Sequence, residues 1–227
     1  MSPTSIMALI GFGPALVLLY VLLGSYEGYF KDNKAFFMVT FGLVIGLIIG
    51  VFSMYLPLAD FLWTLALVFL IELIKYVILL QKPFRLKHDA TFYGMALGLG
   101  MAAMMVFTYG FYAGLDHVET KTMLFVLLLS YNYNVLHGST GALIGYGCYT
   151  GDFWKYFLRA FLISGGHGFL MSAIWATPYQ DSGSESRLFA LLIIGAVYVT
   201  LLLLYIYKEI IPKTIPKEMR LAKEGIK

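Results

Sequence analysis

The sequence predicts an all-α membrane protein, a bundle of seven transmembrane helices, and three observations favour this fold class. Of the 227 residues, 60% are hydrophobic and only 13% are charged. Apolar runs of about 20 residues, the length that crosses the hydrocarbon core of a bilayer, recur along the chain. The loops between these runs are short, and basic residues are distributed unevenly among them. These features predict a polytopic protein in contact with the lipid bilayer and no nucleic-acid partner.

The predicted spans, in chain order, cover residues 6–23, 35–56, 58–80, 90–111, 122–148, 155–177 and 187–207. The first run has no basic residue before it and no convincing cleavage site, so we expect a retained span rather than a signal peptide. We assign residues 1–209 to one seven-helix transmembrane domain. Residues 210–227, which contain Pro212 and Pro216, are expected to form a short basic cytoplasmic tail.

The basic residues predict the orientation of the chain. Only Lys121 and Arg187 fall in loops on one side of an alternating seven-span path. Thirteen of the 16 basic residues fall on the other side: Lys31, Lys34, Lys82, Arg85, Lys87, Lys155, Arg159, Lys208, Lys213, Lys217, Arg220, Lys223 and Lys227. Because cytoplasmic loops carry an excess of Lys and Arg, we expect an outside N-terminus and a cytoplasmic C-terminus in a multi-pass protein of the cell membrane.

The third predicted span contains two ionisable residues, Glu72 and Lys75. An ionised side chain in mid-membrane costs roughly 2.5–3.5 kcal/mol on translocon scales, and such residues usually face other helices. The i,i+3 spacing puts both side chains on one helix face, about 5–6 Å apart at Cβ, so they can neutralise each other. Two interpretations stay open here: a structural ion pair that orients the helix, or part of a functional site.

Two histidines join this pair in the apolar segments, His137 in the fifth predicted span and His167 in the sixth. Counting about 1.5 Å per residue from the span ends puts Glu72 and both histidines near the midplane, where they can meet. The histidines could form interhelical hydrogen bonds that lock the bundle, each worth of order 1 kcal/mol. They could instead belong to a general-base site that polarises water for hydrolysis, or to a metal site.

We favour the interhelical lock and expect neither a metal nor another cofactor. The histidines lack an HExxH-like spacing, which weakens the metal hypothesis. The single cysteine, Cys148, provides neither a disulfide framework nor a thiolate cluster. A transporter is disfavoured because the sequence has no inverted repeat and no clearly interrupted pair of helices.

The fourth predicted span contains two glycines four residues apart, Gly94 and Gly98. Small residues at this spacing let helix backbones approach closely in membranes. We therefore expect a helix-packing face here, and we expect it to be used within the chain rather than against a partner.

Three segments follow one another along spans three to six. They are Ile71-Glu72-Leu-Ile-Lys75, the glycine-spaced segment from Asp89 to Met101, and the two spans that bear His137 and His167. In this order they resemble the superfamily of PrsW-type and CAAX-type intramembrane glutamic proteases. That family carries EExxK or EExxxR, then an aromatic followed four residues on by Glu or His, then two histidine-bearing helices. The resemblance implies that an active member would use Glu72 with His137 and His167.

The chain departs from this pattern at the residues that would transfer protons. Ile71 aligns with the first glutamate of EExxK, and Met101 and Met105 align with the aromatic and the acid of the second motif. Met171 stands where an Asp or Asn often follows the last histidine. The resemblance therefore implies a site whose packing skeleton remains while its acid–base partners are missing.

A non-catalytic branch of the same superfamily, the Aph-type scaffold subunit of γ-secretase, resembles the chain more closely overall. The likeness rests on Gly11-Phe-Gly13-Pro14 in the first span, the glycine-spaced fourth span, and one histidine in each of spans five and six. The predicted seven-span topology with an outside N-terminus also agrees with that branch. In that branch the histidines are structural and assembly residues, so the resemblance implies a lock for His137 and His167.

We therefore expect a catalytically degenerate, scaffold-like protein, a pseudoprotease, that binds a partner membrane protein. Its structural polar cluster would consist of Glu72, Lys75, His137 and His167, and would hold spans three, five and six together. The alternative is an active PrsW-type intramembrane protease in which Glu72 is the base and His137 and His167 are its catalytic partners.

Overall fold

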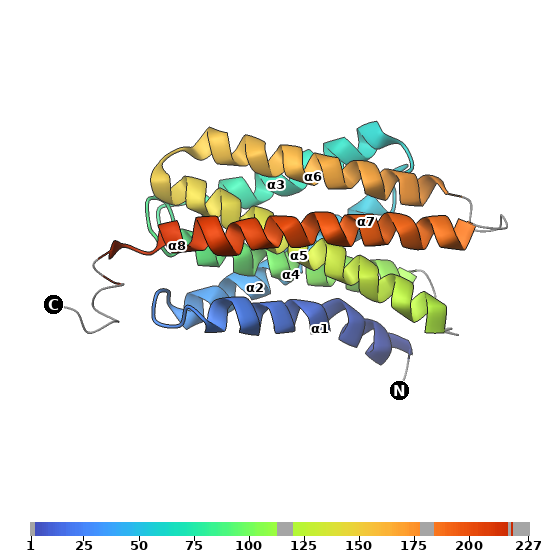
Figure 1. Ribbon diagram of the computed structural model, residues 1–227, viewed down its shortest axis with the longest axis horizontal. Coiled ribbons are helices and arrows are strands. Elements are labelled where there is room, and N and C mark those ends of the chain that lie inside the picture. The colour runs from blue at the N-terminus through green and yellow to red at the C-terminus, as the bar shows by residue number, and fades with distance from the viewer. Residues whose placement is uncertain (1–2, 113–119, 178–183, 218, 220–227) are drawn as a thin grey trace.

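The computed structural model describes residues 3–112, 120–177, 184–217 and 219, and every regular element in these ranges is a helix (Figure 1). Seven long helices run roughly parallel to one axis of the bundle. They are α1 (Pro3–Gly24), α2 (Asp32–Ser53), α3 (Phe61–Leu79), α4 (Ala90–Tyr112), α5 (Thr120–Thr150), α6 (Phe153–Ala176) and α7 (Ser184–Tyr205). The all-α class is therefore confirmed, and each long helix begins and ends within three residues of a predicted span.

The chain does not leave the bundle at the end of α7. A π-helical turn, η1 (Ile206–Ile210), and a short helix, α8 (Ile211–Thr214), continue it directly. Ile211 and Thr214 are completely buried, and the Thr214 hydroxyl lies 3.1 Å from the Thr91 hydroxyl at the start of α4. The first residues of the predicted tail at 210–227 thus pack with the bundle as far as Ile215, while residues 220–227 lie outside the described residues.

Helix α4 is the centre of the bundle, because its small residues let neighbours approach on two sides. A Cβ added at Gly94 would overlap the carbonyl oxygen of Gly141 in α5, and one at Gly98 would overlap that of His137. On the opposite side, a Cβ at Gly46 of α2 would overlap the carbonyl oxygen of Met101. The glycine pair in α4 therefore serves packing within the chain, as its i,i+4 spacing predicts.

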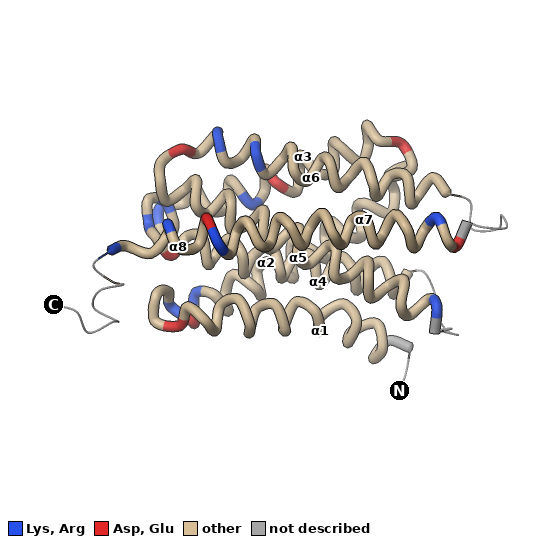
Figure 2. Tube along the Cα trace, in the orientation of Figure 1, with Lys and Arg blue, Asp and Glu red and all other residues tan. Residues whose placement is uncertain are grey.

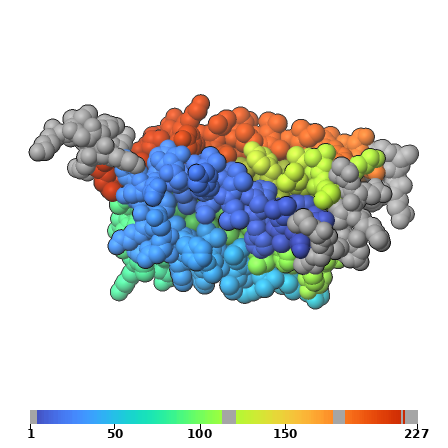
Figure 3. Space-filling model, turned by 90° about the horizontal axis from the view of Figure 1, so that it is seen from below, coloured from blue at the N-terminus to red at the C-terminus, as the bar shows by residue number. Residues whose placement is uncertain are grey.

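The outer helices present apolar side chains to the surroundings. Helices α1 and α2 cover most of one face, and α7 runs along its edge (Figure 3). Large side chains such as Tyr20 of α1 and Phe36 of α2 are more than 70% exposed there. Within the part of the chain that the structure describes, six helical segments are long and apolar enough to cross a membrane: Ser5–Gly24, Asp32–Ser53, Phe61–Leu79, Ala90–Tyr112, Phe153–Ala176 and Glu185–Thr214. These helices are typical of a multi-pass membrane protein.

Helix α5 is the long helix that is absent from this group, and its composition explains why. Its middle carries Asn132, Asn134, His137, Ser139 and Thr140, which lower its mean hydropathy. All five side chains are buried, because α5 packs against α1, α3, α4, α6 and α7. The polar groups of α5 thus face other helices rather than the surroundings.

Charged residues gather toward the two ends of the bundle, and most of the Lys and Arg lie toward one of them (Figure 2). The connections α1–α2, α3–α4 and α5–α6 meet at this basic end. His88 donates from Nε2 to the carbonyl oxygen of Tyr29, at 3.1 Å, and the Leu86 amide donates to the carbonyl oxygen of Cys148, at 2.9 Å. Lys121 and Glu185 form an exposed ion pair of 3.2 Å at the opposite end.

Candidate functional site

The third helix carries a completely enclosed ion pair. Glu72 and Lys75 lie on adjacent turns of one face of α3, and neither side chain is exposed at all. The Lys75 ammonium donates to both carboxylate oxygens of Glu72, at 2.9 Å from Oε1 and 3.0 Å from Oε2. The two opposite charges therefore neutralise each other inside the bundle, as their i,i+3 spacing predicts.

Helices α5 and α6 complete the surroundings of this pair. The Thr140 hydroxyl of α5 accepts from Lys75 Nζ at 2.7 Å and donates to Glu72 Oε1 at 3.1 Å. Ser164 of α6 donates its hydroxyl to the same carboxylate oxygen at 2.7 Å. The ion pair of α3 is thus linked by hydrogen bonds to both α5 and α6.

The contact with His137 fixes the state of its imidazole ring. His137 Nδ1 lies 3.1 Å from Lys75 Nζ. An ammonium can only donate, so Nδ1 must accept, and the neutral ring carries its proton on Nε2. With the carboxylate, Thr140 and His137 as acceptors, all three N–H groups of Lys75 have partners. We call Glu72, Lys75, Thr140, His137 and Ser164 the polar network.

His167 lies beside the polar network and has a partner of its own. The Asn132 amide nitrogen donates to the carbonyl oxygens of Leu128, at 2.8 Å, and Leu192 in α7, at 3.2 Å. This leaves Asn132 Oδ1 to accept from His167 Nε2, at 3.2 Å, so the two histidines are protonated on the same ring atom. His167 of α6 therefore bonds to Asn132 of α5, which in turn bonds to α7. His167 does not bond to Glu72.

The ring of Tyr133 contacts both histidines. Its centroid is 5.7 Å from that of His137 and 6.2 Å from that of His167. The four residues of the predicted cluster are thus neighbours, but Glu72 and His137 each bond to Lys75 while His167 bonds to Asn132.

A small cavity of about 40 Å³, which we call the chamber, lies among these groups and is lined by His137, Ser164 and His167. A water needs roughly 10–15 Å³ measured in this way, so the chamber has room for water but not for a peptide segment. The remaining walls are mainly apolar and include Ile71, Met105 and Met171. Among the described residues, no group of three or more His, Cys, Asp or Glu side chains could hold a metal ion.

Sequence reasoning did not assign a role to Thr140, Ser164 or Asn132. The spacing of the two hydroxyl residues indicates such a role, because Thr140 follows His137 by three residues and Ser164 precedes His167 by three. Residues three apart share a helix face, so a hydroxyl at this distance from a buried histidine is expected to point toward the same neighbours.

Comparison of the chain with family models, with curated proteins and with solved structures finds no match.

Proposed function

We propose that the protein is a catalytically degenerate, scaffold-like membrane protein of the PrsW/CAAX-protease/Aph superfamily. One observation carries the proposal: Ile71, Met105 and Met171, which stand where that superfamily has acidic or amide side chains, all line the chamber beside both histidines. The aligned positions therefore gather at one place, and none of them supplies a group that transfers protons.

The state of Glu72 supports the same proposal. A general base must reach the proton that it abstracts, directly or through one water. Glu72 Oε1 already accepts from Lys75, Thr140 and Ser164, and Oε2 accepts from Lys75. The carboxylate is thus used for holding α3, α5 and α6 together, which is what a scaffold requires.

All seven long helices cross the membrane in this proposal, with the N-terminus outside and the C-terminus in the cytoplasm. With its 31 residues, α5 is about 46 Å long, more than enough to cross a hydrocarbon core of about 30 Å. The excess of Lys and Arg at one end of the bundle supports the orientation. A partner membrane protein would bind to the apolar outer surface, where α1 and α2 expose large side chains.

The proposal is tested by removing the ionisable pair while its volume is kept. We expect the double variant Glu72→Leu/Lys75→Met to remain folded and to co-purify with the same partner, at the same stoichiometry, as the native protein. Loss of the partner from a double variant that melts like the native protein would contradict a purely structural role. The variant Phe36→Ala is the matched test for partner binding, because it changes an exposed side chain of α2 and leaves the ion pair intact.

An active intramembrane protease is the second candidate, and one observation favours it: the chamber beside His137, Ser164 and His167 can hold water. This candidate predicts that fragments of membrane proteins accumulate with the native chain and disappear with Glu72→Gln. Fragment patterns in membranes that contain either protein, compared by mass spectrometry, distinguish the candidates. The scaffold predicts identical patterns.

A further inference from the structure

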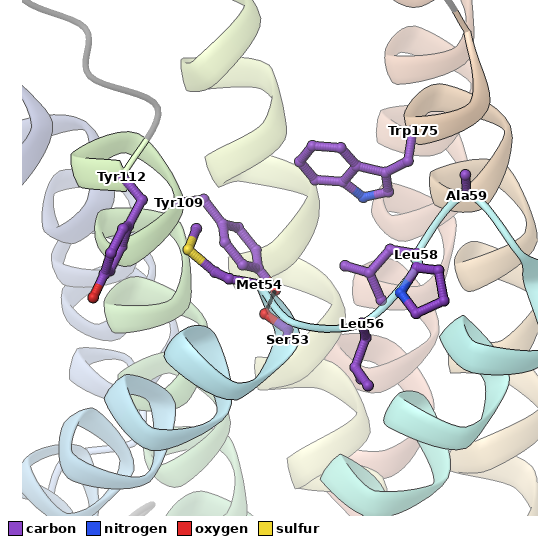
Figure 4. Close-up of a pocket in the computed structure, with 9 residues that line it drawn as sticks. Ser53, Met54, Leu56, Leu58, Ala59, Tyr109, Tyr112 and Trp175 are labelled. Carbon is purple, nitrogen blue, oxygen red and sulfur yellow. Dashed lines mark hydrogen bonds between the residues drawn. The ribbon is translucent and has the colours of Figure 1, made fainter.

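A second cavity lies outside the polar network, at one end of the bundle. It has a volume of about 580 Å³, within the range of roughly 300–1,000 Å³ that small-molecule sites occupy. Tyr109 and Tyr112 of α4 lie on one side, and Trp175 of α6 lies on the other (Figure 4). The α2–α3 connection, which includes Leu58 and Ala59, crosses between them. We call this space the funnel.

The funnel opens at the end of the bundle opposite the basic end, because it is formed by the α2–α3 connection and the last turns of α4 and α6. Its inner limit is formed by Leu58, Tyr109 and Trp175, which also line the chamber. The funnel therefore leads from the membrane interface toward the chamber beside the histidines. The chamber beyond is too small to admit a chain of any length.

The funnel walls select for an apolar occupant. Among the described residues no charged side chain lines them, and two of the hydroxyls are already paired: Ser53 donates to the Gly50 carbonyl oxygen at 2.7 Å and lies 3.0 Å from the Tyr109 hydroxyl. A peptide segment would bring backbone N–H and C=O groups that these walls cannot satisfy, at a cost of several kcal/mol for each group. A hydrocarbon chain has no such groups and gains from burial.

We propose that the funnel binds one acyl chain of a membrane lipid. The head of the lipid lies at the mouth, where Tyr112 is exposed as aromatic residues of the membrane interface usually are. The end of the chain stops at Leu58, Tyr109 and Trp175. A phospholipid and a free fatty acid supply the same chemistry, so the test must separate them.

The test uses the full chain in phosphatidylcholine vesicles with a photoactivatable diazirine at the end of an acyl chain. One sample contains the diazirine in phosphatidylcholine, and a second contains it in a free fatty acid. We expect crosslinks at Leu58 or Tyr109 to exceed those at the exposed residues of α1 and α2 several-fold. Labelling by the first probe identifies a phospholipid chain as the occupant, and labelling by the second alone identifies a free fatty acid.

Two tryptophan substitutions in neighbouring segments provide the control. Ala59→Trp fills the funnel and should reduce these crosslinks at least fivefold, whereas Ala66→Trp on the exposed side of α3 should leave them unchanged. If Ala59→Trp lowers the yield of folded protein, Met54→Trp fills the same space from another position. Crosslinks spread evenly over exposed helices, or crosslinks that Ala59→Trp leaves unchanged, would overturn the proposal. So would a density map of the protein from native membranes with branched, side-chain-bearing density in the funnel.

Discussion

Lys75 is completely enclosed, and its energetic role depends on which neighbours remain when it is changed. Lys75→Met leaves Glu72 as a buried carboxylate with only the hydroxyls of Thr140 and Ser164 as partners. Breaking a buried ion pair on one side costs about 3–5 kcal/mol, since the remaining charge is uncompensated. We therefore expect Lys75→Met to lower the melting temperature of the solubilised protein by about 10 °C or more.

The matched control is Glu72→Leu/Lys75→Met, which removes both charges. Replacing both partners of a buried pair by apolar side chains of similar volume is often neutral or stabilising. We expect the double variant to melt close to the native protein, with a coupling energy between the two sites of several kcal/mol. Additive effects of the two single substitutions would show that the pair is not a coupled unit.

The sequence predicted the ion pair correctly, but it did not predict which residue each histidine contacts. The i,i+3 spacing of Glu72 and Lys75 decides their contact within one helix, so one sequence suffices to predict it. Which residue a histidine meets depends instead on how α5, α6 and α7 are rotated against each other. In the observed rotation His137 contacts Lys75 and His167 contacts Asn132. The position of each residue along its helix does not predict these contacts.

Helices α4 and α5 approach so closely that a single methyl group at their contact must move a backbone. Gly98→Ala would force a Cβ into the carbonyl oxygen of His137, and His137 in turn contacts Lys75. Separation of the two helices would disturb both their packing and the polar network. We expect Gly98→Ala to destabilise the solubilised protein by several kcal/mol, as overpacking of a rigid contact does.

Gly24→Ala is the matched control for this effect, because a Cβ at Gly24, the last residue of α1, meets nothing within 4 Å. Ala has a higher helix propensity than Gly, so this variant should melt at the same temperature as the native protein or slightly higher. Equal losses of stability in both variants would mean that helix propensity, and not the α4–α5 contact, determines the result.

The continuation of α7 is a second element whose role can be measured. Ile211 is completely buried, whereas Lys213 is exposed and pairs with Glu209 at 2.8 Å. Ile211→Ala removes buried apolar volume and should cost about 2–5 kcal/mol. Lys213→Ala should leave the melting temperature unchanged, because exposed ion pairs contribute little. Similar melting of the two variants would assign residues 210–215 to a dispensable tail.

Hydropathy predicted the helix ranges well but not how each helix is used. Apolar length is a local property, so the ends of the long helices could be read from the sequence to within three residues. The proline pair at 212 and 216 suggested a tail, yet Ile210, Ile211 and Ile215 are buried against the bundle. These isoleucines are buried by helices that are distant in the sequence, and no local sequence pattern predicts such contacts.

Across the whole molecule, the open question is whether α5 crosses the membrane as the proposed seven-span topology requires. Cysteine labelling can answer it, because Cys148 is the only cysteine and is completely buried. Lys121 and Lys155 stand just inside the start of α5 and just beyond its end, and both are exposed. If α5 spans the membrane, cysteines at these two positions must react from opposite sides.

We expect Lys121→Cys to react with a membrane-impermeant maleimide on intact cells, together with Tyr55→Cys in the α2–α3 connection. Lys155→Cys and Leu86→Cys should react only after the membrane is opened, since the basic end faces the cytoplasm in this topology. Reaction of Lys121→Cys and Lys155→Cys from one side would reduce the number of spans to six. Reversed labelling of all four positions would keep seven spans and invert the orientation, which would place the mouth of the funnel at the cytoplasmic leaflet.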